Sequence, residues 1–252
     1  MQAPEVVGYL TKPLTSGKYT MVGMPFEHVN NDGKGMDLNK DITFTGVSDG
    51  GGYKSRADWV KVWNGSNGYT TFYWYVGSDE PGDETGWWEY DNETWFSETP
   101  GFENGLKNGG AVFFQAQVGN GKSMTSSGAV ENEPEVEYPV TSGKFTMVGN
   151  PYPVNTDLND ADAFVFVNPD DGEGYKDNAD WIKVWNGSNG YTTFYYYIGS
   201  GEPGDETGWW EHDNETWFSD TPGFANGLQA GQPIFIQAQV GNGKSVIFKK
   251  NF

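Results

Sequence analysis

Hydrophobic and polar positions alternate along short stretches of this chain. The stretches are rich in Val, Thr, Tyr, Phe and Trp, and clusters of Gly, Asn, Asp and Pro separate them about every 8–12 residues. We find no convincing stretch in which apolar residues recur at helical spacing. The pattern therefore predicts an all-β protein built from antiparallel strands.

A hairpin is the clearest predicted unit. Its strands cover residues 58–63 and 69–76, and the Asn-Gly pairs of residues 64–68 supply the positive φ angles that such a turn needs. A further strand is predicted over residues 111–118, and the segment Gly119-Asn120-Gly121 ends it.

Side chains alternate across a strand, so each face of the hairpin can be identified from the sequence. One face is mainly aliphatic and is expected to be the core side: Val60, Val62, Phe72, Trp74 and Val76. The opposite face is mainly aromatic and polar: Trp59, Lys61, Trp63, Tyr69, Thr71, Tyr73 and Tyr75.

The chain contains an internal duplication. Residues 57–123 and 179–245 align without a gap at an offset of 122 and are identical at 54 of 67 positions. The match extends upstream, where residues 16–23 return as 142–149, and copy 1 holds four more residues, net, in the loop around residues 30–35. A small-residue and acidic stretch near residues 126–133 resembles a linker. We therefore expect two tandem antiparallel β-sandwich (jelly-roll-like) domains, residues 1–128 and 129–252.

Charge and composition narrow the classes of partner. The formal net charge is −20, with 35 acidic against 15 basic residues, which disfavours nucleic acid and anionic lipid. The aromatic content of 16%, including 11 Trp, is far above that of a disordered acidic tail. There are no cysteines, hence no disulfides or thiolate sites. The sequence has no run of about 18 apolar residues, so no membrane-spanning helix is predicted, and no signal peptide is visible.

The aromatic face of the hairpin is a candidate glycan-binding surface. Flat indole and phenol rings pack well against the C–H side of a pyranose and lose little entropy on binding. The candidate residues are Trp59, Trp63, Tyr73 and Tyr75 in copy 1, and Trp181, Trp185, Tyr195 and Tyr197 in copy 2. Two alternatives remain open: loops cover this face as a second core layer, or the two Trp side chains stack around Lys61 through cation–π contacts.

A second aromatic group lies among turn-forming and acidic residues. Its members are Trp87, Trp88 and Trp95, repeated as Trp209, Trp210 and Trp217. Tryptophan in a polar, glycine-bracketed segment is harder to assign to a core than tryptophan in a strand. Alternation places Trp87 opposite Trp88, so we expect one of the two to anchor the loop while the other faces outward. All six are candidate ligand contacts.

Acidic side chains gather in the same segments. Calcium takes six to eight oxygen ligands from flexible loops, and the candidates are Asp83, Glu84, Asp91 and Glu93, with Asp205, Glu206, Asp213 and Glu215. Solvated acidic loops are the alternative, and no cofactor is required. Two carboxylates flanking a sugar could also hydrolyse a glycoside. His28 and His212 are the only histidines, and copy 1 has Tyr90 where copy 2 has His212, which excludes a histidine-based site common to both copies.

Several segments carry a resemblance to known proteins: Val6-Val7-Gly8-Tyr9, residues 16–26, 57–63 and 69–75, and Gly149-Asn150-Pro151-Tyr152-Pro153. They resemble uncharacterised secreted and surface β-domain proteins of anaerobic bacteria, whose mature part starts with a Val-Val-Gly-Tyr motif. The resemblance implies export and a β-rich module, and it carries over no activity and no site residue. Copy 2 departs from the motif, with Val136-Glu137-Tyr138 in its place.

Together these features predict a non-catalytic, secreted or cell-surface tandem module. It would bind polysaccharide through exposed Trp and Tyr, at two equivalent sites that act by avidity. A structural or adhesive surface protein that self-associates is the first alternative. A glycan-active enzyme that uses the loop carboxylates is the second.

Overall fold

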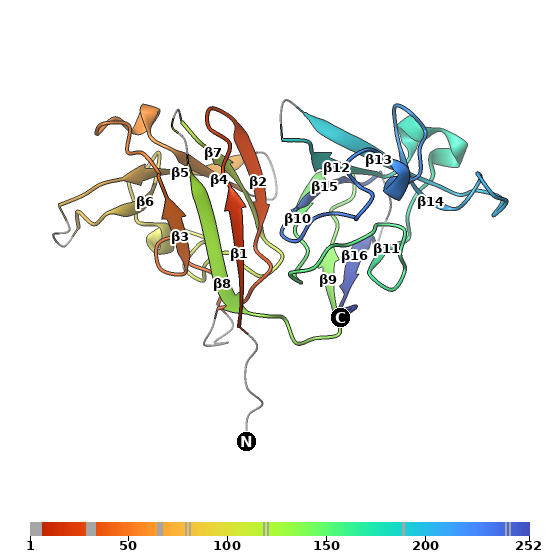
Figure 1. The fold of residues 1–252 in the computed structure, drawn as a ribbon, viewed down its shortest axis with the longest axis horizontal. Helices are drawn as coiled ribbons and strands as arrows, with labels where there is room; N and C mark the ends of the chain where they lie inside the picture. Colours follow the sequence, from red (N-terminus) through yellow and green to blue (C-terminus); the bar gives the residue numbers. More distant parts are fainter. Residues whose placement is uncertain are drawn as a thin grey trace, which may run out of the picture. The chain divides into compact units, whose positions relative to one another are not determined.

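The computed structural model describes residues 7–28, 34–64, 68–78, 80, 82–117, 119, 121–187, 190–239, 241 and 243–252. Most of the four-residue difference around residues 30–35, the centre of the predicted hairpin turn at 65–67, and residues 118 and 120 lie outside these ranges. The chain divides into two compact units, Met1–Glu131 and Asn132–Phe252 (Figure 1). Within the described residues, no helix has both the length and the apolar character needed to cross a membrane.

The first unit contains two antiparallel sheets within its described residues. The three-stranded sheet has the order β1 (Val7–Pro13), β8 (Ser123–Ala129), β3 (Ile42–Thr45). The five-stranded sheet has the order β2 (Tyr19–Gly23), β7 (Ala111–Gln115), β4 (Trp59–Trp63), β5 (Tyr69–Tyr75), β6 (Gly86–Glu89). Single-turn 3-10 helices η1 (Lys54–Arg56) and η2 (Phe96–Glu98) lie in its loops.

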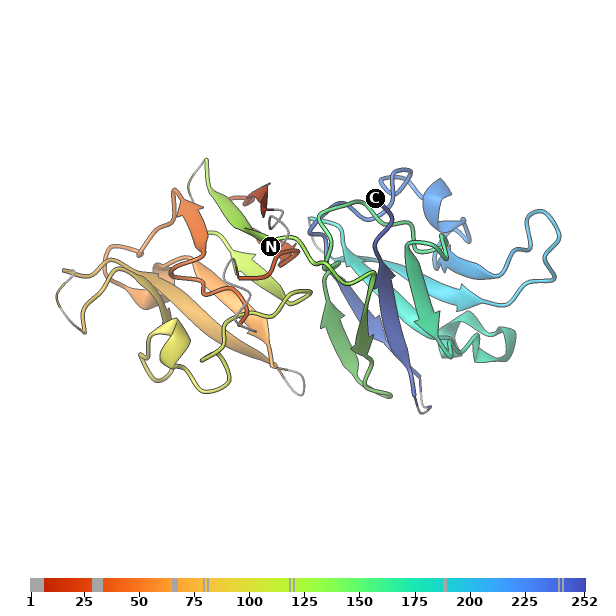
Figure 2. The same ribbon diagram turned by 90° about the horizontal axis from the view of Figure 1, so that it is seen from below.

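The second unit repeats this topology. Its strands are drawn in green to blue in Figure 2. Its three-stranded sheet has the order β11 (Phe164–Val167), β16 (Ser245–Lys249), β9 (Glu135–Pro139). Its five-stranded sheet has the order β10 (Phe145–Val148), β15 (Ile234–Gln237), β12 (Trp181–Trp185), β13 (Tyr191–Tyr197), β14 (Gly208–Glu211). The 3-10 helices are η3 (Gly172–Gly174), η4 (Lys176–Asn178) and η5 (Phe218–Asp220). The all-β prediction is confirmed.

Each unit has an apolar core to which both of its sheets contribute. In the first unit Val60, Phe72 and Phe114 come from the five-stranded sheet, while Ile42 and Met124 come from the three-stranded sheet. The faces of the β4–β5 hairpin follow from this packing, because residues of one face alternate with those of the other. Burial of a Val or Phe side chain contributes about 1.5–3 kcal/mol, which fixes the register of these strands against a one-residue slip.

The predicted core face of the hairpin is correct for most of its length. Val60, Val62 and Phe72 are buried, and Trp74 is partly buried against the same cluster. Val76 is 53% exposed, so its assignment to the core is wrong. The reason is that β5 ends at Tyr75, and the chain turns away from the sheet one residue earlier than the alternation suggested.

A buried ion pair connects distant parts of each unit. Lys122 Nζ lies 2.5 Å from Asp58 Oδ2, and both side chains are at most 2% exposed. The same carboxylate accepts hydrogen bonds from the backbone N–H groups of Ser48 at 2.8 Å and Gln117 at 2.5 Å. Asp180 and Lys244 repeat the pair in the second unit. The Lys of each Gly-Asn-Gly-Lys segment thus neutralises a carboxylate at the start of the central strand.

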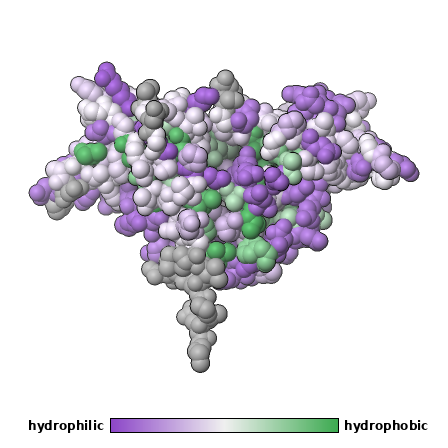
Figure 3. Space-filling view, in the orientation of Figure 1, coloured by the Kyte–Doolittle hydropathy of each residue, from purple (hydrophilic) through white to green (hydrophobic). Residues whose placement is uncertain are grey.

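The surface reflects the acidic composition. Hydrophilic residues cover much of the face drawn in Figure 3, as the net charge of −20 requires. Among the large hydrophobic side chains that are exposed, Tyr53 at 62% and Tyr175 at 69% occupy the same position in the two repeats. The loops before β4 and β12, which carry these two tyrosines, are therefore candidate binding surfaces.

Candidate functional site

A groove of about 690 Å³ opens in the first unit beside the exposed aromatic of the loop before β4. Its lining comes from that loop, from β5 and β6, and from the segments before and after β6. The lining residues are Asp49, Gly52, Tyr53, Lys54, Ser55, Tyr73, Tyr75, Gly82, Asp83, Trp88, Tyr90 and Glu93. The second unit has a groove of about 520 Å³, and each of its lining residues lies 122 positions after a residue of the first: Gly174, Tyr175, Lys176, Asp177, Tyr195, Tyr197, Gly204, Asp205, Trp210 and Glu215.

The floor of the groove follows from strand alternation. Tyr73 and Tyr75 project from one face of β5, and Tyr73 pairs with Trp88 of β6, which places all three rings on the face opposite the core. The rings meet edge to face, with centroids 6.4 Å apart for Tyr73–Tyr75 and 6.1 Å for Tyr75–Trp88. The indole N–H of Trp88 donates to the Glu84 carbonyl at 3.0 Å, which fixes the ring.

The wall opposite is held by the loop around η1. Trp59 Nε1 donates to the Lys54 carbonyl at 2.8 Å and thereby ties this loop to β4. Lys54 Nζ donates to the Tyr90 carbonyl at 2.8 Å and to Glu93 Oε1 at 3.0 Å, and it lies 4.8 Å from the centre of the Tyr90 ring. The hydrogen bond to Glu93 raises the pKa of Lys54, although partial burial opposes it.

The partner of this lysine has an unfavourable backbone conformation. Glu93 has φ 54°, and its counterpart Glu215 has φ 53°. This left-handed backbone conformation is unfavourable for a residue that carries a Cβ atom, and such a residue keeps it only where the surrounding structure holds it there. The same strained glutamate recurs in both repeats, where it faces Lys54 or Lys176. Strain of this kind gathers at ligand sites more often than elsewhere.

A carboxylate completes the floor of the groove. Asp83 Oδ1 accepts a hydrogen bond from the Tyr75 hydroxyl at 2.7 Å, and Oδ2 accepts from the hydroxyl and the N–H of Ser78 at 2.5 and 2.9 Å. The Ser78 hydroxyl and then Tyr75 hold the pKa of Asp83 below its usual range, and the bond to Asp83 raises the pKa of Tyr75. Asp205 makes the same contacts in the second unit.

The lowered pKa of Asp83 predicts how its hydrogen bonds with Tyr75 and Ser78 respond to acid. Since the pKa is lower in the folded than in the unfolded state, the contribution of the carboxylate to stability is present above about pH 4 and is lost as the pH falls through the lowered pKa. We expect Tyr75→Phe to move the carboxyl titration of Asp83 upward, toward the ordinary range. Carbon-13 NMR of the carboxyl groups measures it, with Asp205 in the same sample as the control. An unchanged Asp83 titration would contradict the assignment.

Half of the aromatic ligand contacts predicted in the hairpin line the grooves. They are Tyr73 and Tyr75, with Tyr195 and Tyr197, and they lie beside the carboxylates of Asp83, Glu93, Asp205 and Glu215. Trp88 and Trp210 from the second predicted group join them. Seven lining residues of the first groove were not predicted from the sequence: Asp49, Gly52, Tyr53, Lys54, Ser55, Gly82 and Tyr90. The Tyr-Lys pair that follows a glycine-rich stretch in both copies was the available signal.

Two predicted ligand contacts lie inside the cores. Trp87 is 0% and Trp209 is 2% exposed, so these two assignments are wrong. Their strands place consecutive side chains on opposite faces, and Phe44 and Phe114 enclose the Trp87 ring. The expectation that one Trp of each pair anchors the segment is confirmed, because Trp87 packs in the core while Trp88 lies on the other face.

The remaining predicted aromatics lie beside or away from the grooves. Trp59 and Trp181 anchor the loop, and Lys61 and Lys183 lie 5.2 and 4.8 Å from their ring centres, so the cation–π alternative holds for one of its two tryptophans in each copy. Trp63 packs edge-on against Tyr69 at 5.2 Å, as Trp185 does against Tyr191, and neither lines a groove described above. Trp95 and Trp217 adjoin Trp88 and Trp210 at 5.3 and 5.2 Å.

The acidic side chains do not converge on a single point. Across the described ranges, no three acidic or histidine side chains lie close enough together to hold a metal ion. The candidate calcium ligands instead have separate partners: Asp83 binds Tyr75 and Ser78, Glu84 accepts from the Gly82 N–H at 3.0 Å, and Glu93 pairs with Lys54. Asp213 contacts His212.

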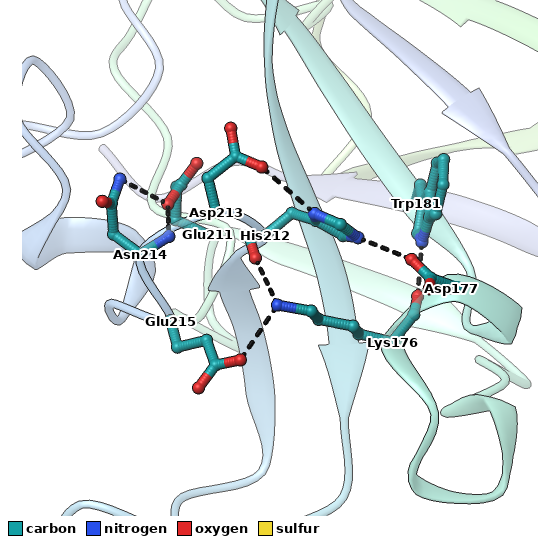
Figure 4. Close-up of polar contacts among 8 residues, drawn as sticks. All are labelled: Lys176, Asp177, Trp181, Glu211, His212, Asp213, Asn214 and Glu215. Atoms are coloured by element: carbon teal, nitrogen blue, oxygen red, sulfur yellow. Dashed lines mark hydrogen bonds and ion pairs between the residues drawn. The ribbon is translucent and has the colours of Figure 1, made fainter.

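The two grooves differ at only two of the twelve positions that line the first: Ser55 and Tyr90 are replaced by Asp177 and His212. The two replacements contact each other, since His212 Nε2 lies 3.1 Å from Asp177 Oδ1. His212 Nδ1 lies 3.3 Å from Asp213 Oδ1, so the imidazole stands between two carboxylates (Figure 4). Its backbone carbonyl accepts from Lys176, as that of Tyr90 accepts from Lys54.

This geometry predicts that His212 is linked to two carboxylates in the second groove. Each ring nitrogen lies within hydrogen-bond distance of one aspartate, and a ring nitrogen that carries a proton donates to the carboxylate that it faces. We expect His212→Phe to shift the carboxyl carbon-13 NMR signals of Asp177 and Asp213. Tyr90→Phe, the matched change in the first unit, is the control and should leave both signals in place. Unchanged signals of both aspartates in His212→Phe would contradict the prediction.

Comparison of the chain with protein-family models, with curated proteins and with solved structures finds no match. A function for this protein therefore rests on the chemistry of the site itself, because a fold alone does not define one.

Proposed function

We propose that this protein is a non-catalytic tandem module that binds polysaccharide, with one groove in each unit. Each unit would be a jelly-roll-like β-sandwich whose five-stranded sheet presents the groove. The observation that carries the proposal is that one groove recurs at matching positions of the two units. In both units the groove has an aromatic floor, an aspartate that accepts a hydrogen bond from a floor tyrosine, and a glutamate with a positive φ angle. As a polysaccharide-binding protein it would act outside the cell, secreted or displayed on the surface, as the resemblance to exported proteins implies.

The chemistry of the lining suits a sugar. Tyr53 is exposed at the lip, Trp88 is half-buried on the floor, and both offer ring faces to the C–H side of a pyranose. Asp83 and Glu93 have acceptor capacity for sugar hydroxyls, and Lys54 supplies N–H donors. The hydrogen bond from Tyr75 to Asp83 and the one from Trp88 to the Glu84 carbonyl hold these groups in place before a ligand arrives, which lowers the entropy cost of binding.

Binding is favoured over hydrolysis by the state of the groove carboxylates. A glycosidase needs one carboxyl group with a raised pKa, to protonate the leaving oxygen. In these grooves hydrogen bonds from Ser78, Ser200 and Lys176 lower the pKa values of Asp83, Asp205 and Glu215 respectively. These three groups are therefore poor proton donors at neutral pH and good hydrogen-bond acceptors.

Two shallow sites on one chain act together. An open groove with a few aromatic contacts gives modest affinity, and a polysaccharide that occupies both grooves binds more tightly by avidity. Affinity electrophoresis tests the proposal, with native gels that contain hydroxyethyl cellulose, xyloglucan, galactomannan, polygalacturonate or alginate. We expect retardation in at least one gel with a neutral polysaccharide. Migration identical to that in a gel without polysaccharide, throughout a wide panel, would refute it.

A further inference from the structure

We propose that each site takes an internal stretch of a neutral polysaccharide chain. In the second unit this chain would cross a ridge formed by Trp210, which lies between two adjoining hollows. The inference rests on the proposed function and defines its ligand class. It is carried by a second hollow that adjoins the groove of the second unit.

Two hollows, each of about 520 Å³, adjoin in the second unit. The first is the groove described above, and the second is lined by Glu206, Thr216, Trp217 and Asp220. Gly204, Trp210 and Glu215 line both. Gly204 has φ 87°, and a Cβ at this position would meet no atom within 4 Å, so the shared rim is open there. The two hollows, together called the depression, therefore meet at Trp210 and share an open rim at Gly204.

Aromatic rings follow this depression in a row. The ring centroid of Trp210 lies 6.3 Å from that of Tyr197 on one side and 5.2 Å from that of Trp217 on the other. A β-bridge joins Trp210 to Trp217, and the Trp210 indole N–H donates to the Glu206 carbonyl at 3.1 Å. The ridge is thus fixed by the backbone on both sides, and successive sugar rings of one chain can each meet an aromatic side chain.

The first unit has the same row of rings. Trp88 lies 6.1 Å from Tyr75 and 5.3 Å from Trp95, and its indole N–H is held by Glu84. At the position of Asp220 the first unit has Glu98, which keeps the carboxylate. Each ring of the row is thus present in both units, as expected if the two sites bind the same class of ligand.

The openness and charge of the depression define the ligand. A site for a chain end needs a wall that stops the chain, whereas here a hollow lies on each side of Trp210 and gives room for sugar rings in both directions. Asp205, Glu206 and Asp220 add negative charge, and Lys176 is paired with Glu215. Uronic acids and sulfated sugars would be repelled, so a neutral chain is expected.

Calorimetry with oligosaccharides of increasing length tests this inference. The oligosaccharides, from di- to hexasaccharide, come from the neutral polysaccharide that retards the protein most. The full chain carries Trp88→Ala and Trp95→Ala, so that only the second unit binds. We expect affinity to rise at least tenfold between the di- and the hexasaccharide. Adding Trp217→Ala should lower hexasaccharide affinity about tenfold and disaccharide affinity less than twofold.

Asp220→Ala is the second variant, because the Asp220 side chain is exposed and, of the two hollows, lines only the second, so we expect the variant to fold. It should weaken hexasaccharide binding selectively. Borohydride reduction, which opens one of the six sugar rings at the chain end, should change the hexasaccharide affinity less than twofold. Equal affinity for both lengths, or equal losses for both lengths in Trp217→Ala and Asp220→Ala, would overturn the inference while leaving the proposed function intact. Failure of every glycan to bind the unmodified protein would instead overturn the proposed function.

Discussion

Replacement of Asp58 by Asn is expected to lower the free energy of unfolding of the first unit by about 3–5 kcal/mol. Lys122 would then keep a positive charge at a site where its side chain is 2% exposed. Breaking a buried ion pair on one side costs more than the pair itself contributes, because the remaining charge is left without a partner and without water. Since domains are typically stable by about 5–15 kcal/mol, this loss is a large fraction of the total.

The backbone contacts of Asp58 add to this effect. Its carboxylate accepts the N–H groups of Ser48 and Gln117, and Asn has one oxygen where Asp has two. Hydrogen exchange of the β4 and β7 amides measures the stability of the first unit separately from the second. Asp180→Asn is the matched change in the second unit and should lower protection of β12 and β15 instead. Asp91→Asn, at an exposed position, should change neither by more than about 0.5 kcal/mol.

A double variant distinguishes the effect of the unpaired Lys122 charge on stability from the effect of losing the Asp58 carboxylate. If unpaired charge is the cause of the destabilisation, the double variant Asp58→Leu/Lys122→Met should be more stable than Asp58→Asn. Protection of β4 in Asp58→Asn equal to that in the unmodified protein would show that the ion pair is not needed for the fold.

The second large effect is expected at the two groove tryptophans. Trp88→Ala or Trp210→Ala alone removes one floor and leaves the other site, so the polysaccharide affinity falls by the avidity factor, about 10²–10⁴-fold at most. The double variant should show no measurable binding. Aromatic residues on the floor of a groove are frequent hot spots, and the loss of one costs about 2 kcal/mol or more.

The singly substituted proteins report whether the two grooves cooperate. If avidity operates, each single variant should bind a hexasaccharide with unchanged affinity per remaining site, while binding of the long polymer weakens strongly. Tyr9→Ala is the control, because Tyr9 is 78% exposed and lies outside the grooves. A single variant that loses all binding would indicate one composite site, and equal polymer binding by all variants would place the ligand elsewhere.

The sequence predicted the parts of the fold that follow from local alternation. Val60, Val62 and Phe72 are buried because a period of two in an antiparallel strand fixes one face once the other is aromatic and polar. The alternation also separated Trp87 from Trp88 correctly, but it could not say which of them was buried. That choice depends on the position of Phe44 and Phe114, which come from strands distant in sequence.

The groove was only partly predictable for the same reason. Tyr73, Tyr75 and Trp88 follow from strand faces, whereas Tyr53 and Lys54 enter through a loop whose path is set by the hydrogen bond from Trp59 and by the ion pair with Glu93. Asp58 and Lys122 lie 64 residues apart, and nothing in their local sequence connects them. Recurrence of both residues in the two copies was the one available signal.

The central claim is that the two grooves bind polysaccharide. Affinity electrophoresis of the unmodified protein beside Trp88→Ala/Trp210→Ala, in gels with neutral and acidic polysaccharides, tests it most directly. Circular dichroism first establishes that the variant is folded. The structure predicts retardation of the unmodified protein by a neutral polysaccharide and free migration of the double variant. Equal migration of the two folded proteins in every gel would contradict it.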